Sequence, residues 1–176
     1  MRTLLCLPFF VFAPLAAAQV TATVEGGIAH AEGATGGLGA VSLGWDAGTF
    51  GPVTVGLTLR PEFFLTPVEA DSSRYRFDAI GNGQTRCRDY SNGQFAATLL
   101  CEGGNETDLS GAFSGAARLD TPAGAFGAGA GYRIGRGEGP FAVATWGVHL
   151  GAVALGLRAD VGAEWASGAG TVAVSF

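Results

Sequence analysis

The sequence predicts an all-β fold: an eight-stranded antiparallel up-and-down barrel that spans a membrane and carries one long outer loop. Apolar and polar residues alternate with a period of two in segments of about ten residues. The composition is 48% hydrophobic and only 14% charged, with 30 glycines. After the first residues, no apolar run is long enough for a spanning helix. Such a chain must either hide much apolar surface or expose it to lipid.

The first residues have the three parts of a secretory signal. Arg2 supplies the charged start, an apolar stretch runs from Leu4 to Leu15, and three alanines end at Ala18. We therefore expect residues 1–18 to be a cleaved signal peptide and residues 19–176 to be one exported barrel domain.

Three strand segments precede the long loop, at about 20–29, 38–46 and 53–63. The third is the clearest, because its apolar residues, which include Leu57 and Leu59, alternate with polar ones such as Thr58 and Arg60. One face of this strand is apolar and the other is polar.

Five segments follow the loop, at about 109–120, 124–134, 141–148 and 153–162, with the last ending at Phe176. In the sixth, the phase of Phe141 and Val143 conflicts with that of Trp146 and Val148, which suggests a β-bulge. Short connections at 47–52, 121–123 and 149–152 then lie at one end of the barrel, and the long loop at about 65–108 lies at the other.

The polar faces are too poor in charge for a typical solvated surface, so we expect the apolar faces to point outward. The interior of the barrel then receives a set with equal numbers of arginines and carboxylates: Glu25, Arg60, Glu62, Arg118, Asp120, Arg133, Arg158 and Asp160. Such a set offsets part of the cost of burying charge. We expect a barrel filled by side chains and not a wide channel.

The same orientation sorts aromatic residues toward the two ends of the strands, as in the girdles of membrane barrels. The alternative is that these are scattered core aromatics. The expected girdle residues are Trp45, Phe63, Phe126, Tyr132, Phe141, Trp146, Trp165 and Phe176.

The alternating segments and the ending from Thr171 to Phe176, with apolar residues at alternate positions, resemble small bacterial outer-membrane barrels. The membrane domain of outer-membrane protein A and its eight-stranded relatives are the familiar members of this class. The resemblance implies an outer-membrane location, contact with outer-membrane lipid, and recognition of Phe176 by the barrel assembly machinery. No particular function follows from it.

After loss of the signal, Cys87 and Cys101 remain, both in the long loop. A pair of cysteines in an exported protein predicts a disulfide, although two free thiols are the alternative. Closing a loop of this size stabilises by roughly 3 kcal/mol in the chain-entropy model.

The long loop also contains two Asn-Gly pairs, at Asn82 and Asn92, which favour tight hairpin turns. We therefore expect a structured extension of β-hairpins that could serve as a recognition surface. Its candidate contacts for anionic glycans or a partner protein are Arg74, Arg76, Arg86, Arg88 and Tyr90. Alternatively, these arginines pair with Glu69, Asp71, Asp78 and Asp89.

The sequence offers little for catalysis. Its two histidines, His30 and His149, fall at opposite ends of the barrel, and no nucleophile-elbow or metal-ligand spacing is present. We expect no enzyme, no cofactor and no metal, and the net charge of −5 argues against nucleic acid.

The first hypothesis for the function is a structural role in the envelope, and the second is recognition through the long loop. A small pore or a lipid-modifying barrel enzyme is the third.

Overall fold

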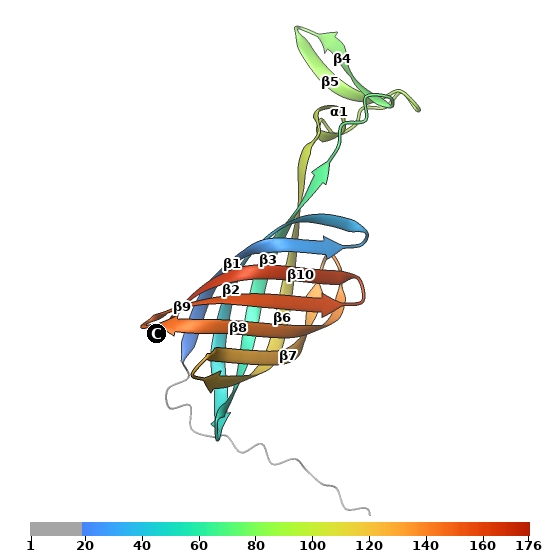
Figure 1. Cartoon of the computed structure of the whole chain (residues 1–176). Coiled ribbons are helices and arrows are strands. Elements are labelled where there is room, and N and C mark those ends of the chain that lie inside the picture. Colours follow the sequence, from blue (N-terminus) through green and yellow to red (C-terminus); the bar gives the residue numbers. More distant parts are fainter. Residues whose placement is uncertain (1–18) are drawn as a thin grey trace, which may run out of the picture.

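The computed structural model describes residues 19–176. The expected signal peptide, residues 1–18, lies outside the described residues. Eight long antiparallel strands close into a barrel in the order β1-β10-β9-β8-β7-β6-β3-β2, and a separate pair, β4 and β5, stands beyond one end (Figure 1). The eight-stranded antiparallel barrel is confirmed.

Before the long loop, β1 covers Val20–Ala31, β2 covers Ala34–Phe50 and β3 covers Val53–Val68. After it come β6 (Gly104–Thr121), β7 (Gly124–Ile134), β8 (Gly139–Leu150), β9 (Val153–Gly162) and β10 (Trp165–Ser175). Pairing of β1 with both β2 and β10 closes the barrel. Several strands are longer than the alternation indicated. The ends of β2 are rich in glycine and alanine, which carry no clear apolar-polar pattern, and β3 and β6 continue as a pair from Phe64 opposite Asp108 to Val68 opposite Gly104.

The two ends of the barrel differ. At one end, here called the turn end, the connections are residues 51–52, 122–123 and 151–152, and β1 begins and β10 finishes there. At the other, here called the loop end, the connections are 32–33, 135–138, 163–164 and the long segment between β3 and β6. The short turns and the single long loop therefore lie at the ends that the sequence predicted.

The expected bulge in the sixth barrel strand is wrong. β8 pairs in continuous register with both neighbours, so Phe141 and Val143 simply face inward while Trp146 faces outward. The irregularity lies instead in β2, where the register with β3 shifts between Asp46 and Gly48.

The long loop is an ordered extension. The paired ends of β3 and β6 run beyond the barrel as a two-stranded stalk, which carries β4 (Tyr75–Gly81), β5 (Gln84–Asp89) and the short helix α1 (Leu99–Glu102) (Figure 1). Asn82 and Gly83, with φ of 51° and 73°, form the turn between β4 and β5. Within residues 19–176, no helix is long and apolar enough to cross a membrane.

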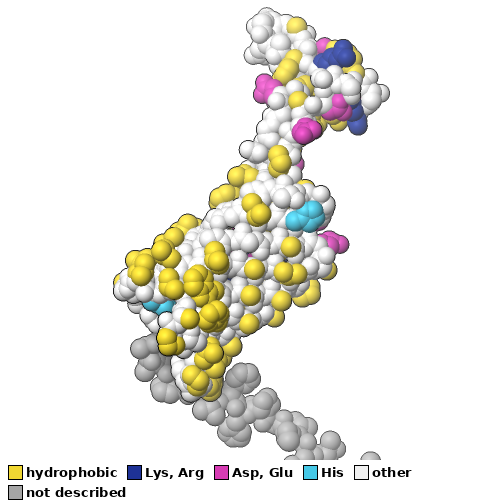
Figure 2. Space-filling model, in the orientation of Figure 1, with side chains coloured by type: hydrophobic (Ala, Val, Ile, Leu, Met, Phe, Trp, Pro, Cys, Tyr) yellow, Lys and Arg dark blue, Asp and Glu magenta, His cyan; other side chains and the backbone are white. Residues whose placement is uncertain are grey.

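Large apolar side chains cover the outside of the barrel. Figure 2 shows them over its flank, whereas the charged side chains visible in that view lie at the loop end and on the extension. The residues that face outward with at least half of their surface exposed include Val24, Ile28, Leu43, Leu59, Leu109, Phe113, Leu157 and Val161. A surface this apolar and continuous is unlike that of a protein surrounded by water.

Candidate functional site

The interior of the barrel holds a compact cluster of buried charges centred on Arg60. Its guanidinium contacts three carboxylates from three strands: Glu25 at 2.9 Å, Glu62 at 2.7 Å and Asp160 at 2.8 Å. Arg60 is 1% exposed, and all three carboxylates are buried as well. One arginine therefore ties β1, β3 and β9 together across the interior.

Two further arginines complete the cluster. Arg133 pairs with Glu62 and lies 3.8 Å from Asp160, while Arg158 approaches Asp160 to 3.0 Å. Hydroxyl groups supply additional donors, because Ser42 donates to Glu25 and Ser110 donates to Glu62. Three arginines thus meet three carboxylates, which offsets part of the desolvation of each buried charge.

Six residues of the expected interior set form this buried cluster, and Arg118 and Asp120 lie outside it. Arg118 lies near the turn end, 3.7 Å from Asp46 and 3.4 Å from Asp120, and its side chain is 35% exposed. Asp120 is exposed as well. The alternation placed Arg118 on the inward face correctly, but it could not tell that this position lies at the open mouth of the barrel.

An apolar plug closes the interior toward the loop end. Its buried side chains are Ala29, Ala31, Leu38, Phe64, Trp165 and Ala169. Phe64 and Trp165 meet edge to face with ring centroids 5.7 Å apart. The guanidinium of Arg133 lies 3.6 Å above the ring of Trp165, so a cation–π contact joins the plug to the charge cluster.

Two of the expected girdle residues are wrong, because Trp165 and Phe141 belong to this interior. Trp165 is 2% exposed and Phe141 is 4% exposed. Trp165 is six residues before Thr171, so strict alternation puts both on the inward face. Because β8 has no bulge, strict alternation places Phe141 on the inward face as well. Phe64, which the sequence analysis did not single out, follows from its position beside outward Phe63.

The other six expected girdle positions keep the outward phase of their strands. Phe63, Phe126, Tyr132, Trp146 and Phe176 are all exposed, and Trp45 is partly exposed. Phe113 also faces outward, and its ring stacks on that of Tyr132 with centroids 6.2 Å apart. Aromatic side chains therefore remain on the outside of the barrel near both ends.

Below the charge cluster, the interior opens into a cavity of about 230 Å³ at the turn end. Its wall is rich in hydroxyl groups, among them Thr23, Ser42, Thr58, Thr145 and Thr171. Several inward glycines lie beside these hydroxyls in the register, such as Gly127 opposite Thr145 and Gly156 opposite Thr171. The inside of the barrel is therefore layered, with an apolar plug, a charge cluster and a polar cavity in turn.

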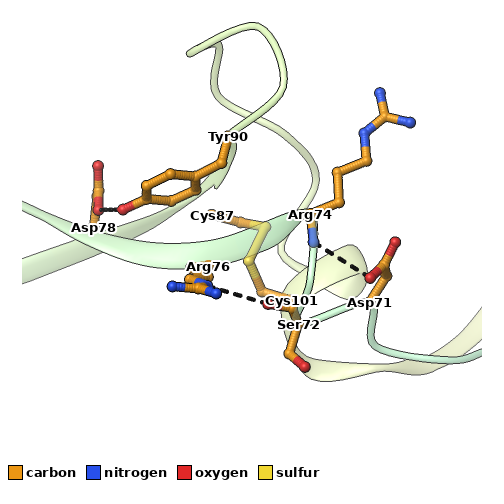
Figure 3. The surroundings of a disulfide bond; sticks show 8 residues. All are labelled: Asp71, Ser72, Arg74, Arg76, Asp78, Cys87, Tyr90 and Cys101. Atoms are coloured by element: carbon orange, nitrogen blue, oxygen red, sulfur yellow. Dashed lines mark hydrogen bonds between the residues drawn. A yellow bond between two sulfur atoms is a disulfide. The ribbon is translucent and has the colours of Figure 1, made fainter.

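The extension is held together by the expected disulfide. Cys87 on β5 and Cys101 on α1 are bonded, with Cα atoms 5.8 Å apart, and Cys87 is 1% exposed (Figure 3). The bond attaches the β4–β5 hairpin to the segment that leads back into the stalk. After β5 the chain turns back, so that Phe95 pairs with Arg88.

Arg74, one of the expected contact residues, has a structural role. Its guanidinium donates to both oxygens of Asp89, at 2.7 Å in the shortest contact, and this pair fixes the base of the hairpin. The hydrogen bonds from Arg74, followed by those from Ser91, lower the pKa of Asp89 well below its usual range. For Arg74, the alternative that the arginines of the loop pair with its own carboxylates therefore holds.

Arg88 and Tyr90 share one carboxylate. Arg88 lies 3.2 Å from Asp78. The Tyr90 hydroxyl donates to the same carboxylate, as Figure 3 shows. Because its proton is held by Asp78, Tyr90 has a pKa above its ordinary value. Arg76 and Arg86 differ from these, because within residues 19–176 neither forms an ion pair with a carboxylate.

The two histidines lie far apart, as expected. His30 pairs across β1 and β2 with Thr35 at the loop end, whereas His149 faces the mouth of the cavity at the turn end. In the described part of the chain, no three histidine, cysteine or acidic residues are grouped as metal ligands would be.

Comparison with known proteins adds little. Neither a protein-family model nor a curated protein matches the sequence. Among solved structures, the translocator domain of the autotransporter NalP from Neisseria meningitidis is 12% identical, with 91% of this chain and 88% of that chain covered and a TM-score of 0.35. A likeness this distant says nothing about what this chain binds or carries.

Proposed function

We propose that this chain is an integral outer-membrane protein with a structural, envelope-anchoring role. The observation that carries the proposal is the inversion of the usual pattern: the outside of the barrel is apolar, and the charges are buried inside in balanced numbers. In lipid, a closed barrel leaves no strand edge unpaired and puts its apolar side chains against acyl chains. The turn end would face the periplasm and the extension the outside.

This proposal includes export and assembly. The signal in residues 1–18 would direct the chain across the inner membrane, and Phe176 would be read by the barrel assembly machinery. Phe176 suits that role because it is 73% exposed at the end of β10. Replacing Phe176 by Ala would reduce the amount of barrel inserted in the outer membrane, whereas Phe113→Ala, on the same outer surface, would not.

The test of the anchoring proposal uses the purified mature chain. Closed barrels keep a distinct gel mobility until heated, so heated and unheated samples in detergent would migrate differently. The same chain would aggregate when detergent is removed. A freely water-soluble, monomeric protein without detergent would overturn the membrane assignment.

The interior also favours a closed barrel over a pore. The plug and the charge cluster lie in series between the loop end and the cavity, and an eight-stranded barrel has little room beyond its side chains. In planar bilayers we expect no large and stable conductance. We likewise propose a non-enzymatic role, because His30 and His149 lie at opposite ends and could not share a site.

A second candidate function, surface recognition, is favoured by the extension. The hairpin is ordered, bonded to α1 through Cys87 and Cys101, and raised on a stalk beyond the barrel (Figure 1). A structural role in the membrane does not require an ordered extension of this kind. Deleting Ser72–Cys101 while keeping the barrel would abolish binding of cells to their surface partner. Unchanged binding after the deletion would remove this candidate.

A further inference from the structure

One face of the β4–β5 hairpin gathers three arginines of the extension, of which Arg76 and Arg86 are exposed and Arg88 is partly buried. In the register of the two strands, Arg76 lies opposite Arg88, and Asp78 lies opposite Arg86. Tyr90 and Phe95 border these residues, since Arg76 lies over the Tyr90 ring and Arg86 lies over the Phe95 ring. We call this set, Arg76, Arg86, Arg88, Tyr90 and Phe95, the arginine face.

The arginine face carries more positive charge than its own carboxylate can neutralise. Asp78 lies within reach of Arg88 at 3.2 Å, and it also accepts the hydrogen bond from Tyr90. Arg76 and Arg88 are directly opposite each other on paired strands, an arrangement of like charges that costs stability. Local arrangements that cost stability are expected at functional sites.

The guanidinium groups are held in place by contacts within the extension, and these contacts leave some of their N–H donors free. Arg76 donates through Nε to the Ser72 carbonyl at 3.1 Å and lies 5.8 Å from the Tyr90 ring (Figure 3). Arg86 and Arg88 lie 5.5 Å and 5.2 Å from the Phe95 ring. This stacking orients planar donors at low entropic cost and leaves the outer edges of Arg76 and Arg86 open to a ligand.

The chemistry of the face fits a ligand that has both carboxylates and apolar ring faces. Planar guanidinium groups bind carboxylates through two parallel hydrogen bonds. The Tyr90 and Phe95 rings, 54% and 51% exposed, offer flat apolar surfaces beside them. A carboxylated sugar satisfies both features, because its ring C–H groups stack on aromatic faces while its acid group meets an arginine. Repetition of such sugars along a chain would match several arginines on one hairpin.

We propose that the arginine face binds an acidic polysaccharide built from carboxylated sugars. This inference rests on the second candidate function, recognition through the extension. A lipid headgroup of the same membrane fits less well, because the stalk holds the hairpin away from the apolar surface of the barrel (Figure 1). An acidic peptide would use the arginines but has no sugar rings for Tyr90 and Phe95.

The experiment measures binding of the full mature chain, in detergent or nanodiscs, to soluble polygalacturonate, with neutral dextran as the comparison. We expect binding to polygalacturonate alone, weakening as salt is raised. The variant Arg86→Gln should lose about tenfold in affinity and Arg76→Gln/Arg86→Gln about a hundredfold. Arg118→Gln, which removes one charge at the turn end, is the matched control and should bind as wild type. Equal loss with Arg118→Gln would overturn the site.

Two further variants test the geometry of the face. Arg76→Lys/Arg86→Lys keeps the charge but lacks the planar fork, so its affinity should fall at least severalfold. Phe95→Ala removes the ring below Arg86 and should weaken polygalacturonate binding more than it weakens binding of a polyglutamate peptide. Wild-type affinity in both variants would reduce the interaction to charge alone and overturn the proposed site. Unheated gel mobility and an intact disulfide show that each variant is folded.

The remaining comparisons separate the ligand classes and the two hypotheses. Polyglutamate binding as tight as that of polygalacturonate would overturn the polysaccharide in favour of an acidic protein. Hyaluronan, from an animal surface, and acidic polysaccharide extracted from the producing cells distinguish a host from a self ligand, and tight binding of either supports the proposal. If deleting Ser72–Cys101 abolishes polygalacturonate binding while Arg76→Gln/Arg86→Gln does not, the arginine face is wrong but recognition stands. If the deletion has no effect, both fail.

Discussion

Arginine meets carboxylate in two regions of this protein, and the two regions leave the charges in different states. In the barrel interior, Arg60, Arg133 and Arg158 face three carboxylates, and all six side chains are buried. On the arginine face of the extension, Asp78 faces Arg88 while Arg76 and Arg86 remain exposed and unpaired within the described residues.

The difference teaches that the role of an arginine is set by its burial and its number of partners, not by its residue type. A buried guanidinium without carboxylates is too costly to keep, so the interior must be nearly neutral. An exposed guanidinium has no such requirement, and it stays available to an outside ligand. The interior cluster therefore serves stability, and the arginine face is free to serve binding.

The largest effect should come from breaking the interior cluster at its centre. Arg60→Met would leave Glu25, Glu62 and Asp160 buried with too little compensating charge. We expect the free energy of unfolding to fall by about 3–5 kcal/mol. A urea titration of the purified barrel, read from the fraction that keeps its unheated gel mobility, would measure this.

Arg118→Met is the control for that measurement, because it removes an arginine from the same inward face at the open turn end. Arg118 is 35% exposed, so its ion pairs should contribute less than about 1 kcal/mol. Equal urea midpoints for the two variants would show that burial is not what distinguishes the interior cluster.

The next effect should be confined to the extension. Cys87→Ser/Cys101→Ser would remove the bond between β5 and α1 and lower the local stability of the extension by roughly 3 kcal/mol. Limited proteolysis should then cut between residues 72 and 101 faster than in the wild type. The barrel should keep its gel mobility and its urea midpoint. A barrel that loosens together with the extension would contradict the separation of the two regions.

Much of this arrangement could be predicted from the sequence, because period-two alternation is a direct consequence of strand geometry. It placed the strands of the barrel, its outward apolar face and six residues of the interior cluster. It did not place Trp165 or Phe141 correctly. Trp165 was assigned from its nearness to a strand end and not from the phase of its strand, and Phe141 was assigned outward because a bulge was assumed in its strand. Counting two by two from Thr171 would have put Trp165 inside.

Other features could not be predicted because they depend on depth and tertiary contact. Alternation gives the face of a residue but not its distance from the barrel mouth, so Arg118 and Arg60 looked equivalent. The partners of the arginines on the extension depend on how β5 turns back to Phe95, and no short pattern specifies that return. The Asn82-Gly83 pair did predict its hairpin, since both residues adopt the positive φ that the turn requires.

The extension is expected to lose stability at both low and high pH. The pKa of Asp89 lies below its ordinary value of 3.8. The ionised Asp89 therefore stabilises the extension at any pH above 3.8, and this stabilisation is lost as the pH falls below that value. The pKa of Tyr90 lies above its ordinary value of 10.0, so its contribution is present below that pH and lost as the pH rises further. The protection of β4 and β5 amides from hydrogen exchange, taken relative to the intrinsic exchange rate at each pH, should fall at both limits.

Variants separate the two limits of that pH range. Asp89→Asn would weaken the extension at neutral pH and flatten its acid response, and Tyr90→Phe would flatten only the alkaline response. The barrel, whose interior charges are buried and paired with one another, should keep its gel mobility over the same range. If the Asp89→Asn variant still lost stability in acid, the loss would come from another carboxylate. Asp71 is the first choice, because a hydrogen bond from Ser73 lowers its pKa as well.

The smallest effect on stability, and the sharpest comparison, should come from Arg76→Gln. This side chain has no carboxylate partner within residues 19–176 and lies opposite Arg88, so its removal also relieves a like-charge contact. Proteolysis and hydrogen exchange of the extension should therefore match the wild type within error, while polygalacturonate affinity falls about tenfold. Arg74→Gln should do the reverse, because Arg74 holds Asp89 and lies outside the arginine face. If Arg76→Gln loosened the hairpin as Arg74→Gln does, Arg76 would be a structural residue like Arg60, and the contrast between the two regions would disappear.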